Sequence, residues 1–140
     1  MLNSWLKVAM PHLNIEYSAN LENSLDMQAL VDRIHQTALE TGIFPLGGVR
    51  TRAEPRRHYR IADGNPRAGY IHMTVRIGPG RDAETRRTAG DSIFAALCDF
   101  TDELYRSQPL ALSFELHEIP SDMAWRKNNL HELLKKESAE

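Results

Sequence analysis

The sequence contains a single cysteine, Cys98, among its 140 residues. One thiol cannot build an internal disulfide framework, and such sparse use of cysteine is typical of a reducing compartment. No apolar run approaches the roughly 20 residues that a membrane-spanning helix needs. The opening stretch, MLNSWLKVA, is too short and too mixed in character for a secretory signal. We therefore expect a cytoplasmic protein with no membrane partner.

An excess of basic charge is also missing, since the formal net charge at pH 7 is −2. General nucleic-acid binding usually requires a basic domain. The most basic stretch, TRAEPRRHYR, is short and holds one aromatic residue, so an RNA-binding module is a weak interpretation. The turn GPGRDA does not match G-x-G-x-x-G, and no Walker lysine is present. We expect no nucleic-acid partner.

A metal motif is not evident among the 6 histidines. His12 and His72 fall on expected strands in different halves of the chain, and His131 begins HELLK, which lacks the second histidine of H-E-x-x-H. Cys98 lies in an expected helix beside Leu97, where a core thiol is more common than a nucleophile. We therefore expect no metal site.

The chain contains the same strand–helix–strand pattern in each of its two halves. His12–Ser18 alternates polar and apolar residues, which predicts a half-buried strand. A helix follows, with Asn23 or Ser24 as its cap and Gly42 as its stop. The stretch GVRTRAE then predicts a second strand, and a polar loop covers residues 55–69.

The second half repeats this order. YIHMTVRIG alternates as a strand, Asp82 is placed to cap a long helix reaching Leu104, and Pro109 ends that helix before the strand LALSFELHEI. Two strand–helix–strand units at a spacing of roughly 60 residues predict a duplicated fold. Each helix is then a crossover between parallel strands.

We expect an α/β domain of the α+β type, in which a four-stranded, mainly parallel sheet carries both helices on one face. The single domain covers residues 11–140, with halves at about 11–55 and 70–119 and a C-terminal tail. No third layer is left to cover the other face, so we expect an oligomer that stacks sheets. The tail, WRKNNLHELLKKESAE, predicts a short amphipathic helix that reaches a neighbouring subunit.

Arginines are the strongest candidates for a binding site. Arg50 and Arg52 lie two apart on an expected strand, which places both on one face. Arg81 follows the GPG turn and precedes a helix, where exposed backbone N–H groups favour anions. Guanidinium groups bind carboxylates in bidentate fashion. Each arginine alone is better read as a solvated surface charge, but the three together indicate an acidic ligand about as well as they indicate solvated charges.

Met10 and Pro11 stand directly before the first strand. Inside a longer chain, proline at the start of a strand is merely structural. If translation starts at Met10 and the methionine is removed, Pro11 carries a free secondary amine, which is able to act as a base. Residues 1–10 are then an extension that includes the true start.

The stretches MPHLNIEYSAN, TGIFPLGGVRTR, YIHMTVRIGPGR and LALSFELHEI together resemble the 5-carboxymethyl-2-hydroxymuconate isomerase family of the tautomerase superfamily. The resemblance runs from Met10 to about Leu134 and implies a duplicated β–α–β fold assembled as a homotrimer. It places the family's amino-terminal proline, a proton shuttle, on Pro11. The family's arginines fall on Arg50 and Arg81, and Arg52 matches a further arginine whose role is less defined.

The resemblance implies a cofactor-independent isomerase (a tautomerase) in the breakdown of homoprotocatechuate, which is formed from 4-hydroxyphenylacetate. The implied substrate is a dienol with three carboxylates, which becomes a conjugated ketone when a proton moves from its 2-hydroxyl to carbon. No hydride moves and no metal is needed, so no cofactor is expected. With MLNSWLKVA attached, the Pro11 nitrogen is an amide without a basic lone pair.

Two alternatives stay open. Another reaction of the same superfamily, dehalogenation or decarboxylation of an unsaturated acid, would need a water-activating carboxylate near Pro11, for which Glu16 and Glu115 are candidates. A non-catalytic trimer that binds a small acid is favoured if the extension masks Pro11.

Overall fold

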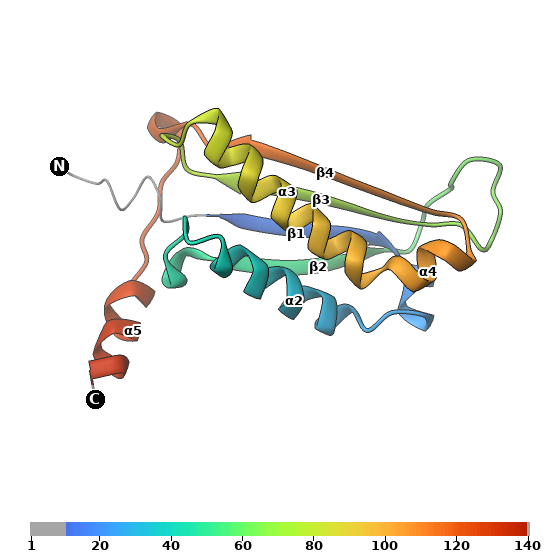
Figure 1. Cartoon of the computed structure of the whole chain (residues 1–140), viewed down its shortest axis with the longest axis horizontal. Helices are drawn as coiled ribbons and strands as arrows, with labels where there is room; N and C mark the ends of the chain where they lie inside the picture. Colours follow the sequence, from blue (N-terminus) through green and yellow to red (C-terminus); the bar gives the residue numbers. More distant parts are fainter. Residues whose placement is uncertain (1–10, 140) are drawn as a thin grey trace.

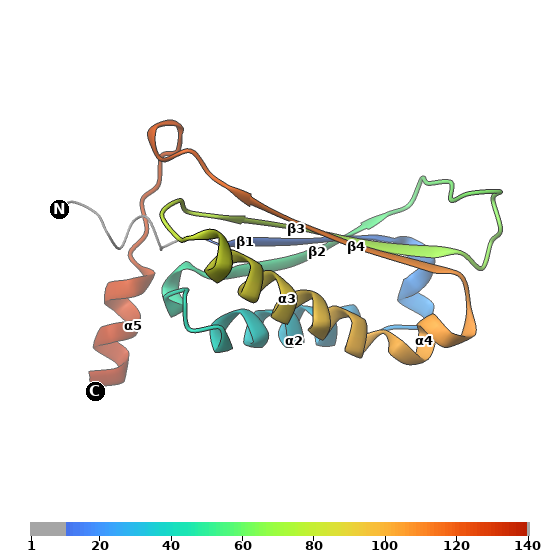
Figure 2. The ribbon, with the colours of Figure 1, turned by 45° about the horizontal axis from the view of Figure 1, so that its top comes forward.

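The computed structural model describes residues 11–139. The proposed start at Met10 and the rest of the extension lie outside the described residues. The described chain has two layers: a four-stranded sheet, and helices α2 (Met27–Glu40) and α3 (Ala83–Phe100), which lie across one of its faces (Figure 1). Turning the molecule brings both helices clearly to the same side of the sheet (Figure 2). The strands are β1 (His12–Ser18), β2 (Arg50–Arg56), β3 (Gly69–Ile77) and β4 (Leu110–Glu118).

The strand pairing confirms the duplicated arrangement. The order in the sheet is β2-β1-β3-β4, and each half forms a parallel pair, β1 with β2 and β3 with β4. The two halves meet where β1 runs antiparallel to β3. The sheet is therefore mixed, with parallel pairs on both sides of an antiparallel centre.

The first helix begins later than predicted. A 3₁₀ turn, η1 (Ala19–Asn23), occupies the expected helix start and buries Leu21 completely. The cap is Asp26, whose carboxylate accepts a hydrogen bond from the backbone N–H of Ala29 at 3.0 Å. The prediction of Asn23 or Ser24 was wrong because burial of the Leu21 side chain takes the chain through an extra turn. The predicted stop at Gly42 is confirmed by its left-handed φ of 77°.

The second helix starts where predicted but ends early. Asp82 caps α3 by accepting from the Thr85 N–H at 2.7 Å. The helix stops at Phe100, and a separate short helix, α4 (Asp102–Ser107), follows. The Thr101 hydroxyl donates to the Leu97 carbonyl at 2.8 Å, and such bonding to the preceding turn disturbs a helix.

The β2 strand extends beyond its predicted limit, through Pro55 to Arg56. Proline cannot donate to a strand ladder, but β2 is an edge strand and tolerates it. The polar loop is correspondingly shorter and covers residues 57–68.

The core fills the space between the sheet and the two helices. The alternation predicted for β1 and β3 is confirmed, because their apolar residues all point to this layer. Burying such side chains stabilises the fold by about 1.5–3 kcal/mol each. The largest fully buried apolar members are Leu13, Ile15, Leu21, Leu30, Ile34, Ile71, Met73, Val75, Ile77, Ile93 and Leu97.

The opposite face of the sheet is polar. Alternation places His12, Asn14 and Glu16 of β1 there, in register with arginines and a glutamate of β2. A shallow hollow of about 530 Å³ lies over the middle of this face. No third layer covers this face among the described residues, and stacking of sheets in an oligomer stays a prediction.

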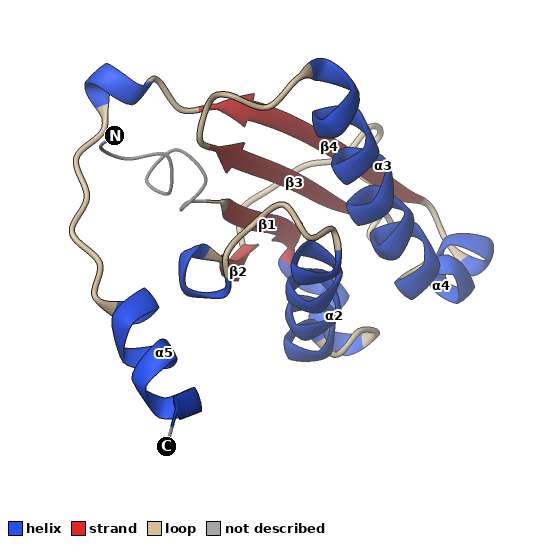
Figure 3. Ribbon diagram, turned by 60° about the vertical axis from the view of Figure 1, so that its left-hand side comes forward, coloured by secondary structure: helices blue, strands red, loops and turns tan. Residues whose placement is uncertain are grey.

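The C-terminal tail packs on its own chain. After β4, a 3₁₀ turn, η3 (Ser121–Met123), leads into a non-helical segment, and α5 (Leu130–Ala139) begins later than predicted. The segment passes the end of the sheet at which β1 starts (Figure 3). The Asn128 side chain donates to the carbonyl of Gly47 in the turn η2 (Leu46–Gly48) at 3.0 Å. Contact with a neighbouring subunit stays a prediction. No helix among residues 11–139 is long and apolar enough to cross a membrane.

Candidate active site

Pro11 lies at the head of β1 and is buried. Its carbonyl accepts the backbone N–H of Arg50 at 3.3 Å, which ties the start of β1 to the start of β2. Because side chains alternate along a strand, the Pro11 ring points to the same side as Leu13, the side that carries the helices. The candidate proton shuttle thus lies at the end of the sheet, at the edge of the core.

Arg50 lies one register position from Pro11 on the neighbouring strand, paired with His12. Its guanidinium donates to the Gly48 carbonyl at 3.3 Å, and the residue is half-buried. The side chain therefore lies against the η2 turn and keeps its positive charge beside the start of β1.

Arg52 is on the same sheet face as Arg50, as the sequence predicted. Its Nη1 lies 3.2 Å from Nδ1 of His12. Because a guanidinium only donates, His12 accepts through Nδ1, which assigns the proton of the neutral imidazole to Nε2. Arg52 thus orients the residue next to Pro11.

Arg81 is placed by the glycine turn that precedes α3, where Gly80 has a φ of 114°. Its guanidinium donates to the Gly78 carbonyl at 3.1 Å and to the Ile43 carbonyl at 2.8 Å. It also lies over the Phe44 ring, 5.0 Å from the centroid. Burial lowers the pKa of Arg81, and the Glu118 carboxylate opposes that shift. Arginine nevertheless stays protonated at neutral pH.

The connector between α2 and β2, residues 41–49, links these arginines. Arg81 binds its first part through Ile43, and its last residues lead into Arg50. Residues from both halves of the chain therefore meet at one end of the sheet: Pro11 and Arg50 from the first, Arg81 from the second.

His12 belongs to this site, although sequence reasoning considered it only as a metal ligand. Burial lowers its pKa, and the charges of four arginines, led by Arg52 and Arg50, lower it further. A neutral imidazole next to Pro11 offers a hydrogen bond without adding positive charge. The feature that could have identified His12 as a site residue is its position directly after Pro11 and opposite Arg50 on the neighbouring strand.

Arg126 of the C-terminal tail is a further residue that the sequence did not reveal. Its positive charge is the smallest of the four arginine charges that lower the pKa of His12, the first residue of β1. The position of Arg126 relative to β1 depends on the course of the C-terminal tail, which no local sequence pattern predicts. Among residues 11–139, no group of three or more histidine, cysteine or acidic side chains is arranged to hold a metal.

The two carboxylates considered for dehalogenation or decarboxylation, those of Glu16 and Glu115, bond to other side chains of the sheet. Glu16 accepts hydrogen bonds from Tyr70 at 2.6 Å and from Arg56 at 3.3 Å. It lies five residues along β1 from Pro11, about 16 Å away at 3.3 Å per residue. Glu115 lies on β4 between His72 at 3.1 Å and His117 at 2.7 Å. Neither carboxylate is placed to activate water beside Pro11.

A duplicated β–α–β chain, with a proline directly before its first strand and bonded through its carbonyl to Arg50 of the neighbouring strand, is typical of the tautomerase class of protein. The sequence model of the family "5-carboxymethyl-2-hydroxymuconate isomerase" matches residues 11–134. The chain belongs to this family of isomerases, whose reaction needs no cofactor.

Individual relatives agree with the family match. The chain is 37% identical over 126 residues to the 5-carboxymethyl-2-hydroxymuconate Delta-isomerase of Escherichia coli, which covers 90% of this chain and 100% of the relative. A crystal structure of a 5-carboxymethyl-2-hydroxymuconate isomerase from Deinococcus radiodurans R1 superimposes with a TM-score of 0.84 at 34% identity, covering 91% of this chain and 96% of that one. A crystal structure of a 5-carboxymethyl-2-hydroxymuconate delta-isomerase superimposes with a TM-score of 0.85 at 30% identity, covering 92% of this chain and 95% of that one.

Proposed function

We propose that this protein isomerises 5-carboxymethyl-2-hydroxymuconate, converting the dienol to its conjugated keto form with Pro11 as the proton shuttle. The observation that supports this best is the placement of Pro11: it heads β1, is joined through its carbonyl to Arg50, and is the first residue of the family match. The proposal extends to the pathway, the breakdown of homoprotocatechuate and 4-hydroxyphenylacetate.

The working chain is proposed to begin at Pro11, after translation from Met10 and removal of that methionine. The mature domain is then residues 11–140. The chemistry requires this start because the nitrogen of an internal proline is an amide and has no basic lone pair. The family match supports it, because it begins at Pro11 and includes none of the preceding residues.

The Pro11 amine performs both proton transfers. As a general base it takes the proton from the 2-hydroxyl of the dienol, and as a general acid it returns a proton to carbon. The base must be uncharged before each turnover. Burial at the edge of the core disfavours the charged form of an amine and so favours the neutral base.

The arginines bind and orient the acidic substrate. Arg50 is proposed to hold a carboxylate so that the reacting carbon lies near the Pro11 nitrogen. Arg81 adds positive charge where the dienolate oxygen develops, while its bonds to Gly78 and Ile43 fix the connector that carries Arg50. Arg52 binds substrate more weakly in this proposal, because its guanidinium already contacts His12.

The proposed assembly is a homotrimer. Both outer strands, β2 and β4, present edges that pair with no other strand among the described residues. Uncovered edges invite pairing with another chain. Cytoplasmic location is retained as a proposal because a lone, half-buried cysteine fits a reducing compartment.

A direct assay tests this function. A chain that begins at Pro11 is incubated with the dienol, and the conjugated ketone is followed by its absorbance and by NMR. We expect turnover without any added cofactor, and no turnover of a halogenated acrylate measured in parallel. Absence of dienol turnover by a folded, Pro11-initiated protein would contradict the proposal, and release of halide would favour the dehalogenase alternative.

A further inference from the structure

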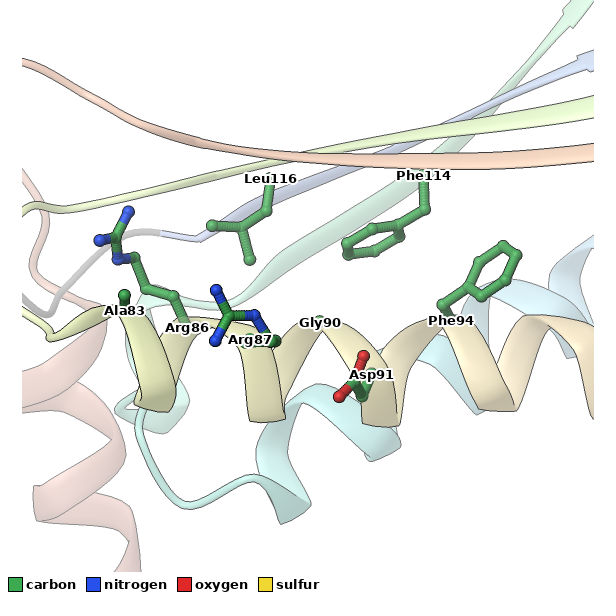
Figure 4. A pocket seen from close by; sticks show the side chains of 8 residues that line it. All are labelled: Ala83, Arg86, Arg87, Gly90, Asp91, Phe94, Phe114 and Leu116. Carbon is green, nitrogen blue, oxygen red and sulfur yellow. The ribbon is translucent and has the colours of Figure 1, made fainter.

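An apolar groove lies between α3 and β4, on the side of the molecule away from the start of β2. It has a volume of about 440 Å³, and its floor is formed by Phe94, Phe114 and Leu116 (Figure 4). The two rings lie 6.2 Å apart at an interplanar angle of 57°. Gly90 keeps the floor open, because any side chain at this position would project toward Phe114. The groove borders β4, an edge strand.

A second apolar feature of the same chain is exposed. We call residues 121–127 the arm; it runs from η3 toward α5. Met123 is 68% exposed and Trp125 is 86% exposed. Such large side chains gain substantially from burial, and apolar groups gathered on an exposed segment mark an interaction site. The bond from Asn128 to Gly47 ties the end of the arm to the η2 turn of its own chain.

We infer that Met123 and Trp125 of one copy of this chain insert into the groove of a second copy. The charges along the two surfaces are complementary. Arg87 and Asp91 flank the groove in order along α3. On the arm, Asp122 precedes the two apolar side chains and Lys127 follows them. Alignment of the arm with Asp122 toward Arg87 and Lys127 toward Asp91 pairs opposite charges at both ends.

The geometry of this contact favours a closed ring. The arm and the groove are different surfaces of the chain. The arm of each copy binds the groove of the next copy, so the contact is heterologous. Heterologous contacts close into rings when the rotation allows. The inference rests on the proposed assembly of three copies and identifies what holds them, but it does not depend on the isomerase reaction.

Light scattering after size-exclusion chromatography tests the contact. Trp125→Ala removes the main anchor, and Gly90→Leu fills the groove while replacing glycine by a better helix former. Loss of an aromatic anchor at an interface centre weakens association by about 30-fold or more. We expect both variants to dissociate toward a single chain on dilution, and the control Tyr105→Ala, an exposed aromatic on α4, to keep the mass of three chains. Thermal melts confirm that each variant folds.

Cross-linking between copies gives an independent readout. In a Cys98→Ser background, which keeps both Met123 and Trp125, chains carrying Lys127→Cys are mixed with chains carrying Asp91→Cys and oxidised with copper phenanthroline. We expect a disulfide between unlike chains, and none when Tyr105→Cys replaces Asp91→Cys. If the wild type assembles but neither variant dissociates and no link forms, the arm contact is wrong. A monomeric wild type overturns the assembly as well, and isomerase activity of the same samples tests the proposed function separately.

Discussion

At the scale of single residues, Arg50 joins the architecture to the proposed chemistry. Its backbone N–H bonds to Pro11, and its guanidinium lies against Gly48. The backbone hydrogen bond between Arg50 and Pro11 does not depend on the side chain at position 50. The charge of the site can therefore be changed while its backbone geometry is kept.

Replacement of Arg50 by alanine is predicted to lower kcat/KM on the order of 10²-fold, because a charged donor for the substrate is lost. The melting temperature should change little, since the backbone bond to Pro11 is kept. Steady-state kinetics and thermal melts check this, with Arg106→Ala as a matched control, an arginine whose side chain is 78% exposed on α4. Unchanged kinetics for Arg50→Ala would exclude the proposed role.

His12 is predicted to make stability depend on pH. Its folded-state pKa is lowered below 6.5, first by burial and then by Arg52, so below about pH 6.5 the unfolded chain binds more protons at this site than the folded chain does. The free energy of unfolding should therefore fall as the pH drops through 6.5 toward the lowered folded pKa.

Denaturant unfolding at pH 7.5 and 5.5 measures this loss. His12→Asn keeps a polar side chain at the position but removes the titration, so its loss of stability between the two pH values should be smaller than that of the wild type. Identical losses in the two proteins would show that His12 does not couple to folding.

At the scale of elements, the start of α2 shows where local pattern and tertiary packing diverge. Asn23, Ser24 and Asp26 are all good capping residues by type. Only the burial of Leu21 in the η1 turn determines which of them meets the helix. Capping propensity alone does not reveal that choice.

Asp26→Ala is predicted to reduce the free energy of unfolding by about 1 kcal/mol, the usual cost of losing a helix cap. Ser24→Ala should cost less, because Ser24 lies outside the helix. Parallel denaturant titrations compare the two variants. A larger loss for Ser24→Ala would mean that the helix begins where the sequence pattern first indicated.

The anchor of α5 on η2 depends on the absence of a side chain at Gly47. A Cβ there would lie 2.9 Å from Nδ1 and 3.0 Å from the backbone nitrogen of His131, closer than atoms tolerate. Gly47→Ala is predicted to displace α5 and raise hydrogen exchange in that helix while the sheet stays protected. Asn128→Ala, which removes the bond to Gly47 without a clash, should act in the same direction but less. Unchanged protection of α5 in Gly47→Ala would contradict the anchor.

At the scale of the whole molecule, the sheet was the most predictable part. Alternation in His12–Ser18 and in the third strand assigned both the strands and their buried face, because a half-buried strand has a period of two. The same rule placed Arg50 and Arg52 together. The surroundings of Arg81 were not predictable, because its partners Ile43 and Phe44 lie on a connector whose path depends on tertiary contacts.

Whether Pro11 acts through a free amine is tested by comparing two forms of the chain. One form begins at Pro11 and the other retains residues 1–10, with both termini verified by intact mass. We expect efficient turnover of the dienol by the first form and loss of activity in the second, whose Pro11 nitrogen is an amide. Equal activity of the two forms, with the extension still attached after the assay, would contradict it.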